Sequence, residues 1–441
     1  MPENKHDMQQ SIGGMAALAT VAGTVIGAGV FFKAGAVTAA THSPLLALIV
    51  WLLAGIITVC AGLTCAELAA AFPETGGLMK YIEHAYGRFW GFLAGWAQSF
   101  IYFPANIAAI AIVFSTQLIN LMGWSSRWII PGAIVTAVVV LAVNLISVRA
   151  GGIVQTVTLI VKLIPLALIV AVGLMHGQSL SLARLGAPAH SGHYSLAAAL
   201  ANGLLATMFA YDGWINVGNI AGEMKRPGRD LPRAIGWGLT LVTGVYVVVN
   251  LVFLLVLPFS LVTGNLNVAA LAADRLFGPL GGRIVTVGIL ISVYGALNGY
   301  VMTGMRVPYV LGQERRLPGS NWFARLNRGG VPWFAGVVQL AIAALLALSG
   351  SFNAVTNMLV FVIWIFYLLA FCGVIKLRRA QPTLARPYRV PGYPVIPLFA
   401  IAGGCFILGM TLFTQAQITV LGILATLIGI PVYWWYQWLE Q

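Results

Sequence analysis

The sequence predicts an all-α protein that crosses a membrane many times. Of its 441 residues, 60% are hydrophobic and only 8% are charged, a balance that a soluble fold of this size could not keep in solution. A helix needs about 20 apolar residues to span a bilayer, and twelve stretches of the chain approach or exceed that length. Glycine-rich sequence interrupts two of them, at matching places in two halves of the chain.

The twelve predicted spans follow one another with short connections. They cover residues 12–39, 44–72, 88–121, 128–147, 150–175, 195–222, 234–258, 278–304, 332–350, 353–377, 393–414 and 418–438. The polar tail before them has no apolar core of the signal-peptide type, so we expect the first span to be its own targeting signal.

The net charge of +13 is distributed unevenly between the loops. If the N-terminus is cytoplasmic, most of the 24 lysines and arginines fall in cytoplasmic loops, and the opposite side holds only Lys33, Arg127, Arg184, Arg275 and Arg283. This is the asymmetry of the positive-inside rule. It predicts a multi-pass protein of the cell membrane, in contact with lipid, with both termini cytoplasmic and no nucleic-acid partner.

Spans one to five and six to ten resemble each other in order, because each set opens with a glycine-broken helix. A unit of five crossings that is repeated directly must invert in the membrane, and inverted repeats are typical of secondary transporters. The predicted division is a cytoplasmic tail at 1–10, a first repeat at 11–177, a second repeat at 195–378, and an added pair of spans at 392–438.

The first break reads Gly-Thr-Val-Ile-Gly-Ala-Gly-Val-Phe at 23–31. Backbone freed from a helix inside a bilayer survives only where it lines a cavity or meets a ligand. If the helix stops near Val25 and restarts near Ala28, its carbonyls favour an ammonium and its amides favour a carboxylate, which matches an amino acid zwitterion. The alternative is that Gly27 and Gly29 only allow tight helix packing.

The second break reads Phe-Ala-Tyr-Asp-Gly-Trp at 209–214. Phe209 and Trp214 are suitable lids over a small ligand, although aromatic residues at such places often only pack. Asp212 could bind an ammonium, exchange a proton or hydrogen-bond the unwound backbone, and the sequence leaves these roles open.

Lys162 lies inside the fifth span, with an apolar stretch on both sides. An ammonium at mid-membrane is costly and indicates function. A lysine that snorkels to the interface is the alternative, but the depth of Lys162 favours a functional role.

Motifs of enzymes and metal sites are missing from the sequence. It has no His-Glu-x-x-His, no cysteine pair at zinc spacing and no phosphate-binding Gly-x-x-x-x-Gly-Lys loop. His190 and His193 in a polar loop are more typical of solvated side chains than of a metal pair. We expect no cofactor, no metal and no enzymatic activity; a membrane enzyme or a sensor without transport is a remote alternative.

Four motifs in order resemble those of the amino acid–polyamine–organocation superfamily. They are the two breaks, Pro-Glu-Thr-Gly-Gly at 73–77 and Gly-Glu-Met-Lys-Arg-Pro at 222–227. Within the superfamily the chain looks like the bacterial members of the L-type amino acid transporter family, and among these like the serine/threonine exchangers. The resemblance runs from about Ser11 to the twelfth span and implies a LeuT-like fold of two inverted five-helix repeats, with spans one and six unwound around the substrate.

The resemblance also implies a substrate site. In similar transporters the carboxylate rests on amides of the first break and the amine faces carbonyls of both breaks, with the aromatic residue here represented by Phe209 closing the site from outside. The implied substrate residues are Val25, Ile26, Gly27, Ala28, Gly29, Phe209, Ala210 and Asp212, and the implied coupling or gating residues are Lys162, Ser292, Phe209 and Trp214.

Lys162 matches a fifth-span lysine whose ammonium replaces a sodium ion of sodium-coupled relatives, and Ser292 is its expected partner in span eight. The resemblance thus implies sodium-independent exchange of small neutral L-amino acids by alternating access. The alternative is proton-coupled symport, with the proton on Lys162 or Asp212. Many relatives have a small residue at the position of Asp212, so the purpose of its carboxylate stays open. Animal relatives join a glycoprotein through an external cysteine that this chain lacks, and we expect no such subunit.

Overall fold

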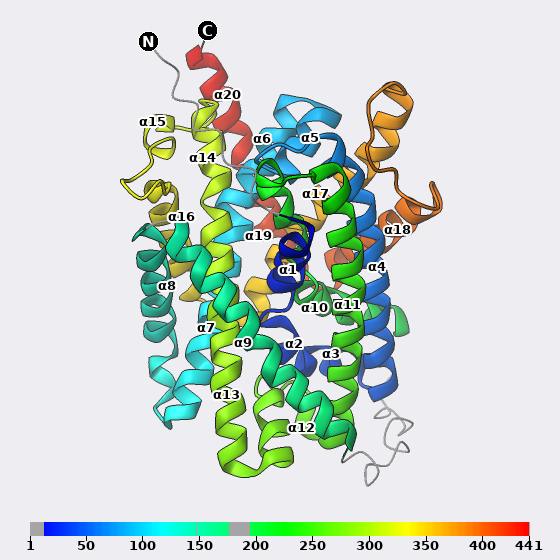
Figure 1. The fold of residues 1–441 in the computed structure, drawn as a ribbon, viewed down its shortest axis with the longest axis vertical. Coiled ribbons are helices and arrows are strands. Elements are labelled where there is room, and N and C mark those ends of the chain that lie inside the picture. Colours follow the sequence, from blue (N-terminus) through cyan, green and yellow to red (C-terminus); the bar gives the residue numbers. More distant parts are fainter. Residues whose placement is uncertain (1–12, 147, 176–194, 441) are drawn as a thin grey trace.

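The computed structural model describes residues 13–146, 148–175 and 195–440, and the regular structure of these residues is entirely helical. Most of the long helices run along the longest axis of the molecule (Figure 1), with α1, α2 and α10 in the middle of the view. The predicted tail at 1–10 and the loop with His190 and His193 lie outside the described residues.

The first half of the chain forms helices up to residue 175. Their bounds are α1 Gly14–Val25, α2 Gly29–Phe32, α3 Ala34–Thr41, α4 Pro44–Ala71, α5 Leu78–Tyr86, α6 Arg88–Ala97, the π-helical η1 Gln98–Tyr102, α7 Phe103–Met122, the 3₁₀ turn η2 Ser126–Trp128, α8 Ile129–Ile146 and α9 Val148–Met175.

The second half begins at α10. Its helices are α10 Leu196–Ala210, the 3₁₀ helix η5 Trp214–Glu223, α11 Pro227–Val256, α12 Phe259–Val262, α13 Val268–Gly304, α14 Arg306–Gln313, α15 Ser320–Phe323, α16 Trp333–Ala347, α17 Phe352–Ala380, α18 Val395–Thr414, α19 Ala416–Leu427 and α20 Gly429–Glu440.

Within the described residues, 8 helical segments are long and apolar enough to span a bilayer, and 9 if Val21–Phe32 and Ala34–Thr41, bent by 58°, count as one span. The remaining three predicted spans also lie on helix: on α9, on α10 with η5, and on α16. They are shorter or broken, as in the apolar pieces Val161–Met175 and Trp333–Ala347. The structure is thus a polytopic membrane fold, and the count of twelve and the inverted repeat stay predictions.

Long helices begin and pack by ordinary local rules. α4 starts at Pro44 behind Ser43, whose hydroxyl accepts a hydrogen bond from the Leu46 amide, and serine before a proline at the first helical position is a strong start signal. Small residues then allow close approach: a Cβ on Gly55 would lie 2.2 Å from a methyl of Thr243 on α11. This is the small-residue packing typical of membrane helices.

The two ends of the bundle carry different elements. α5, α15 and the end of α20 lie at one end, which we call the α5 end, and α12 lies at the other (Figure 1). The α5 end is the one that the charge distribution predicts to be cytoplasmic.

Candidate functional site

The first break follows α1 directly. α1 ends at Val25, and Ile26 has a ψ of 88°, outside the helical range. Helical structure resumes at Gly29, so Ile26, Gly27 and Ala28 form a short unwound stretch, and all three are buried. The break therefore lies at the positions from which the sequence predicts backbone contacts to a ligand.

The second break follows α10. The chain turns at Tyr211, Asp212 and Gly213 before η5 begins at Trp214. Gly213 has a φ of +103°, and a Cβ there would also lie 3.2 Å from the Thr24 carbonyl oxygen. A side chain would be strained and crowded at this point, so the glycine is required by the turn itself.

The two breaks contact each other. A Cβ on Gly29 would lie 2.3 Å from the Cα of Ala210, so only glycine lets α2 approach α10 this closely. The hydroxyl of Thr24 also lies 3.3 Å from the carbonyl oxygen of Gly213. Gly29 thus allows close packing of the two breaks. Gly27 is less crowded, because a Cβ there would meet only the Ala296 methyl at 3.0 Å.

One hydroxyl from α11 joins the last carbonyls of both interrupted helices. The Tyr246 oxygen lies 2.7 Å from the carbonyl oxygen of Val25 and 3.0 Å from that of Ala210. A tyrosine hydroxyl carries one proton, so it cannot donate a full hydrogen bond to both carbonyls at once. The Val25 carbonyl, an expected amine ligand, therefore shares a single donor with Ala210.

Asp212 is held by three tyrosines. Its Oδ2 accepts hydrogen bonds from Tyr102 at 2.5 Å and from Tyr300 at 3.2 Å, and its Oδ1 accepts one from Tyr367 at 2.9 Å. The carboxylate is only 4% exposed, and the three donors come from η1, α13 and α17. Three converging donors suit an ionised carboxylate, which only accepts hydrogen bonds. The sequence leaves open whether Asp212 binds an ammonium, exchanges a proton or forms structural hydrogen bonds. In this conformation it forms structural hydrogen bonds, and its partners are tyrosines and not the unwound backbone alone.

Phe209 lies beside a lysine that the sequence analysis places wrongly. Lys33, expected among the outer-loop cations, is 0% exposed. Its Nζ donates to Thr356 Oγ1 at 2.6 Å and to Asn353 Oδ1 at 3.0 Å. The ammonium also lies 5.4 Å from the centre of the Phe209 ring. The sequence analysis counts this charge with the outer loops, whereas polar groups of α17 and an aromatic face receive it.

Trp214, the second expected lid, is fully buried. Its ring packs on Tyr367 with 5.3 Å between ring centres, and only 1% of the residue is exposed. In this conformation it supports the tyrosine that binds Asp212.

Lys162 reaches the first interrupted helix. Its Nζ donates to the carbonyl oxygen of Gly23, two residues before the end of α1, and the side chain is 1% exposed. The hydroxyl of Ser292, its expected partner, is buried without a hydrogen-bond partner. The predicted hydrogen bond between Lys162 and Ser292 is therefore absent in this conformation.

Sequence reasoning missed the tyrosines that organise the site. Tyr102, Tyr246, Tyr300 and Tyr367 each lie inside a long apolar helix and are buried. A buried tyrosine hydroxyl usually needs a polar partner, so tyrosines at mid-span were an available signal. Their common target was not available, because they lie on helices far apart in the sequence.

Among residues 13–146, 148–175 and 195–440, no group of three or more histidine, cysteine, aspartate or glutamate side chains is placed to hold a metal ion. The potential ligands at the centre of the bundle are instead backbone carbonyls and amides, tyrosine hydroxyls and one carboxylate.

A family model of amino acid permeases matches residues 12–437. The chain belongs to this family. It is thereby a member of the amino acid–polyamine–organocation superfamily, as its four motifs indicate.

Several characterised transporters resemble this permease over most of their length. The serine/threonine exchanger SteT of Bacillus subtilis is 39% identical over 436 residues, 98% of each chain. The human b(0,+)-type amino acid transporter 1 is 30% identical over 89% of this chain and 80% of its own. The mouse Asc-type amino acid transporter 1 is 29% identical over 97% and 81%.

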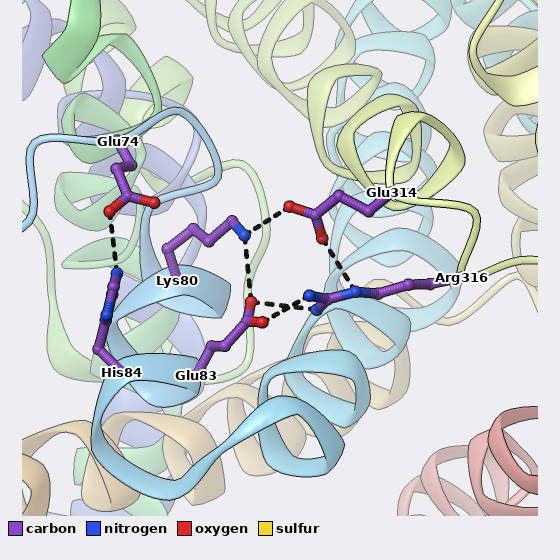
Figure 2. A network of polar contacts seen from close by, with 6 residues as sticks. All are labelled: Glu74, Lys80, Glu83, His84, Glu314 and Arg316. Atoms are coloured by element: carbon purple, nitrogen blue, oxygen red, sulfur yellow. Dashed lines mark hydrogen bonds and ion pairs between the residues drawn. The ribbon is translucent and has the colours of Figure 1, made fainter. Parts of the chain in front are cut away.

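At the α5 end, the permease has a closed ring of four charged side chains (Figure 2). Lys80 of α5 pairs with Glu83 at 3.1 Å and with Glu314 at 2.5 Å. Arg316 completes the ring by pairing with Glu83 at 2.5 Å and with Glu314 at 3.0 Å. The ring fastens the connection between α4 and α6 to the connection between α14 and α15.

The ring alters the acid–base properties of its members. Burial opposes ionisation of Glu83, but Arg316 and Lys80 outweigh it and hold the pKa of Glu83 below its usual range. Burial also opposes the charge of Lys80, and its two glutamate partners outweigh this and raise its pKa. Glu83 and Lys80 therefore both stay charged near neutral pH.

A second ionic cluster lies at the same end and centres on Glu67 of α4. The carboxylate accepts two hydrogen bonds from Arg378 of α17, at 2.8 Å and 2.5 Å. Arg386 lies 3.4 Å away, and the Val390 amide donates at 2.8 Å. Glu67 is 2% exposed, so this is a buried carboxylate with arginine and amide partners.

Proposed function

We propose that this permease exchanges small neutral L-amino acids, serine and threonine first, across the cell membrane without sodium. Both termini are cytoplasmic in this proposal, so the α5 end faces the cytoplasm. The substrate binds between the two interrupted helices, and access alternates between the two sides of the membrane.

The observation that carries the proposal is the shared hydrogen bond of Tyr246. A substrate ammonium that binds the Val25 carbonyl leaves Tyr246 free to donate fully to Ala210, so binding removes a competition that exists in the empty site. The carbonyls of Phe209 and Asp212 in the second break complete the amine site, and Ile26 and Ala210 lie beside them.

The carboxylate of the substrate binds the amides of Gly27, Ala28 and Gly29. Backbone groups supply these polar contacts, and they recognise the part that all amino acids share. Gly29 and Ala210 already touch, which leaves little room for a large substrate side chain. Small neutral substrates fit this space, and the 39% identity to a serine/threonine exchanger supports the same class.

Phe209 closes the site from the outer side, with Trp214 supporting the wall beside it. Lys33 and Phe209 come from the two interrupted helices, and both contact α17: the Phe209 ring packs edge-to-face on Phe352 at 5.4 Å. Opening toward the outside would move the α2–α3 segment away from α17 and break the bonds of Lys33 to Asn353 and Thr356.

Opening toward the other side requires a different set of bonds to break. The ring of Lys80, Glu83, Glu314 and Arg316 and the cluster at Glu67 both join elements of the two halves of the chain. In alternating access, these ionic contacts hold the α5 end closed while the opposite end is open. They break when the α5 end opens.

Lys162 takes the place of a coupling cation. Its bond to the Gly23 carbonyl ties α9 to α1 just before the break, and a tethered ammonium needs no sodium gradient. In another conformation of the cycle, the unpartnered hydroxyl of Ser292 on α13 would accept a hydrogen bond from the same ammonium.

Proton-coupled symport is the second candidate, and the neutral partner of Lys162 favours it. A buried ammonium bound to a carbonyl, with no carboxylate at that contact, can give up its proton more easily than one in an ion pair. Asp212 is the other candidate for the proton.

Reconstitution in liposomes tests the proposal. Labelled serine is supplied outside vesicles that contain serine, threonine, alanine, arginine or no amino acid, with and without sodium and an inward pH gradient. We expect uptake only against internal neutral amino acids and no effect of sodium. Uptake into empty vesicles that rises with the pH gradient would replace exchange by symport, and absence of any uptake or counterflow would leave a sensor without transport.

A further inference from the structure

A groove at the α5 end lies outside the substrate path. It has a volume of about 520 Å³ and lies between α4, α11 and the segment 381–394 that joins α17 to α18. Its lining comprises Val59, Leu63, Gly228, Arg229, Pro232, Arg233, Gly236, Trp237, Thr240, Pro387, Tyr388 and Pro391. The groove thus combines apolar walls with two guanidinium groups.

The residues of α11 in the groove follow one face of the helix. Arg229, Arg233 and Trp237 are spaced by four residues, so they lie one above the other at intervals of about 6 Å. The exposed Leu241 follows after another four. This order runs from cationic through amphipathic to apolar, which is the order of headgroup, interface and acyl region in a bilayer leaflet.

The opposite wall is apolar. Val59 and Leu63 line the groove from α4, and Leu52 and Ile56 continue the exposed surface of α4 deeper in the span, 47% and 42% exposed. Trp237 is 69% exposed. Leu52 and Ile56 lie within a span long and apolar enough to cross a membrane, so a lipid acyl chain is the expected contact of this wall.

No carboxylate among the described residues competes for the two arginines inside the groove. Its lining contains no acidic residue. Asp230, next to Arg229, lies against α1, since a Cβ on Gly14 would be 3.2 Å from its Cγ. Glu67 is already bound by Arg378, Arg386 and the Val390 amide. Arg229 and Arg233 are therefore available to a ligand anion.

We propose that this groove binds the headgroup of an anionic phospholipid, with Arg229 and Arg233 around the phosphate and the acyl chains on α4 and α11. The lipid would contact α4, α11 and the segment 381–394. Its binding is independent of the substrate site.

The test compares lipid binding by the purified full-length protein and by a variant that carries Arg229→Gln and Arg233→Gln. The protein is placed in nanodiscs of phosphatidylcholine with increasing phosphatidylglycerol, and retained lipids are counted by native mass spectrometry. Each basic residue near an anionic headgroup contributes about fivefold in affinity, so the double variant should bind phosphatidylglycerol roughly 30-fold more weakly.

Matched controls separate a site from general charge. Arg325→Gln with Arg328→Gln removes the same charge at another loop and should retain wild-type binding. An equal loss of phosphatidylglycerol binding in the control pair, or unchanged binding in the double variant, would overturn the proposal. An equal rise in melting temperature with inorganic phosphate alone would overturn it as well.

Discussion

The hydroxyl oxygen of Tyr246 lies 2.7 Å from the carbonyl oxygen of Val25, at the point where the first interrupted helix ends. The same hydroxyl reaches Ala210, at the end of the second interrupted helix. Tyr246 thus contacts both breaks at once, and in the proposed function a ligand amine would compete with it for the Val25 carbonyl.

Tyr246→Phe removes the only described side-chain donor to these two carbonyls. The empty protein should lose about 1–3 kcal/mol of stability, the usual cost of unpaired buried polar groups. Serine should then raise the melting temperature more than in the wild type, because its ammonium binds a carbonyl with no competitor. The control is Tyr211→Phe, whose hydroxyl binds the Trp51 carbonyl at 2.9 Å. An equal response to serine in both variants would contradict the proposed amine site.

Asp212→Leu leaves three buried tyrosine hydroxyls without their acceptor. Each unpaired donor costs about 1–3 kcal/mol, so we expect a large loss of stability and yield. Asp212→Asn keeps the shape and one acceptor and should lose less. Thermal melting of both variants in detergent measures the difference; equal melting temperatures would show that the tyrosines do not depend on the carboxylate.

Gly29→Ala should damage the protein far more than Gly27→Ala. The new methyl at position 29 would lie 2.3 Å from a backbone atom of Ala210, whereas at position 27 it would meet only the Ala296 methyl at 3.0 Å. Serine exchange and melting temperature should fall sharply in the first variant and modestly in the second. The larger change Gly27→Leu should abolish serine binding by filling the site, and normal affinity there would refute the site assignment.

Lys162→Ala should slow exchange more than it weakens serine binding, because the lysine ties α9 to α1 and does not face the ligand. The measurement compares the serine dissociation constant in detergent with the exchange rate in liposomes. Ser292→Ala should give a smaller decrease in rate with unchanged binding. A Lys162→Ala variant that exchanges at the normal rate would remove the role assigned to the lysine.

The ionic ring at the α5 end should weaken at acid pH. The pKa of Glu83 is lowered in the fold, so its contribution to stability is present above the pKa of the unfolded chain and is lost as pH falls through the folded value. The pKa of Lys80 is raised, so its contribution is lost only as pH rises through its folded value. Glu83→Gln should reduce the acid-dependent part of the melting curve, and an unchanged pH dependence would contradict this.

The sequence by itself determined the helical membrane fold, the positions of the two breaks and the buried Lys162. These features are encoded locally: apolar length, glycine in a helix and a charge at mid-span each have a meaning that needs no partner. The assignment of Lys33 to the outer loops was wrong. A residue near a span end has the same local sequence whether it meets water or another helix.

Only the tertiary structure decided what the breaks touch. The contact of Gly29 with Ala210, the three tyrosines on Asp212 and the shared hydroxyl of Tyr246 each join helices that are distant in the sequence. A hydrogen bond or a close contact depends on positions within a few tenths of an ångström, and helix packing fixes those positions. The sequence predicts that a polar site exists inside the membrane. The packing of α2, α10, α11, α13 and α17 determines which atoms form it.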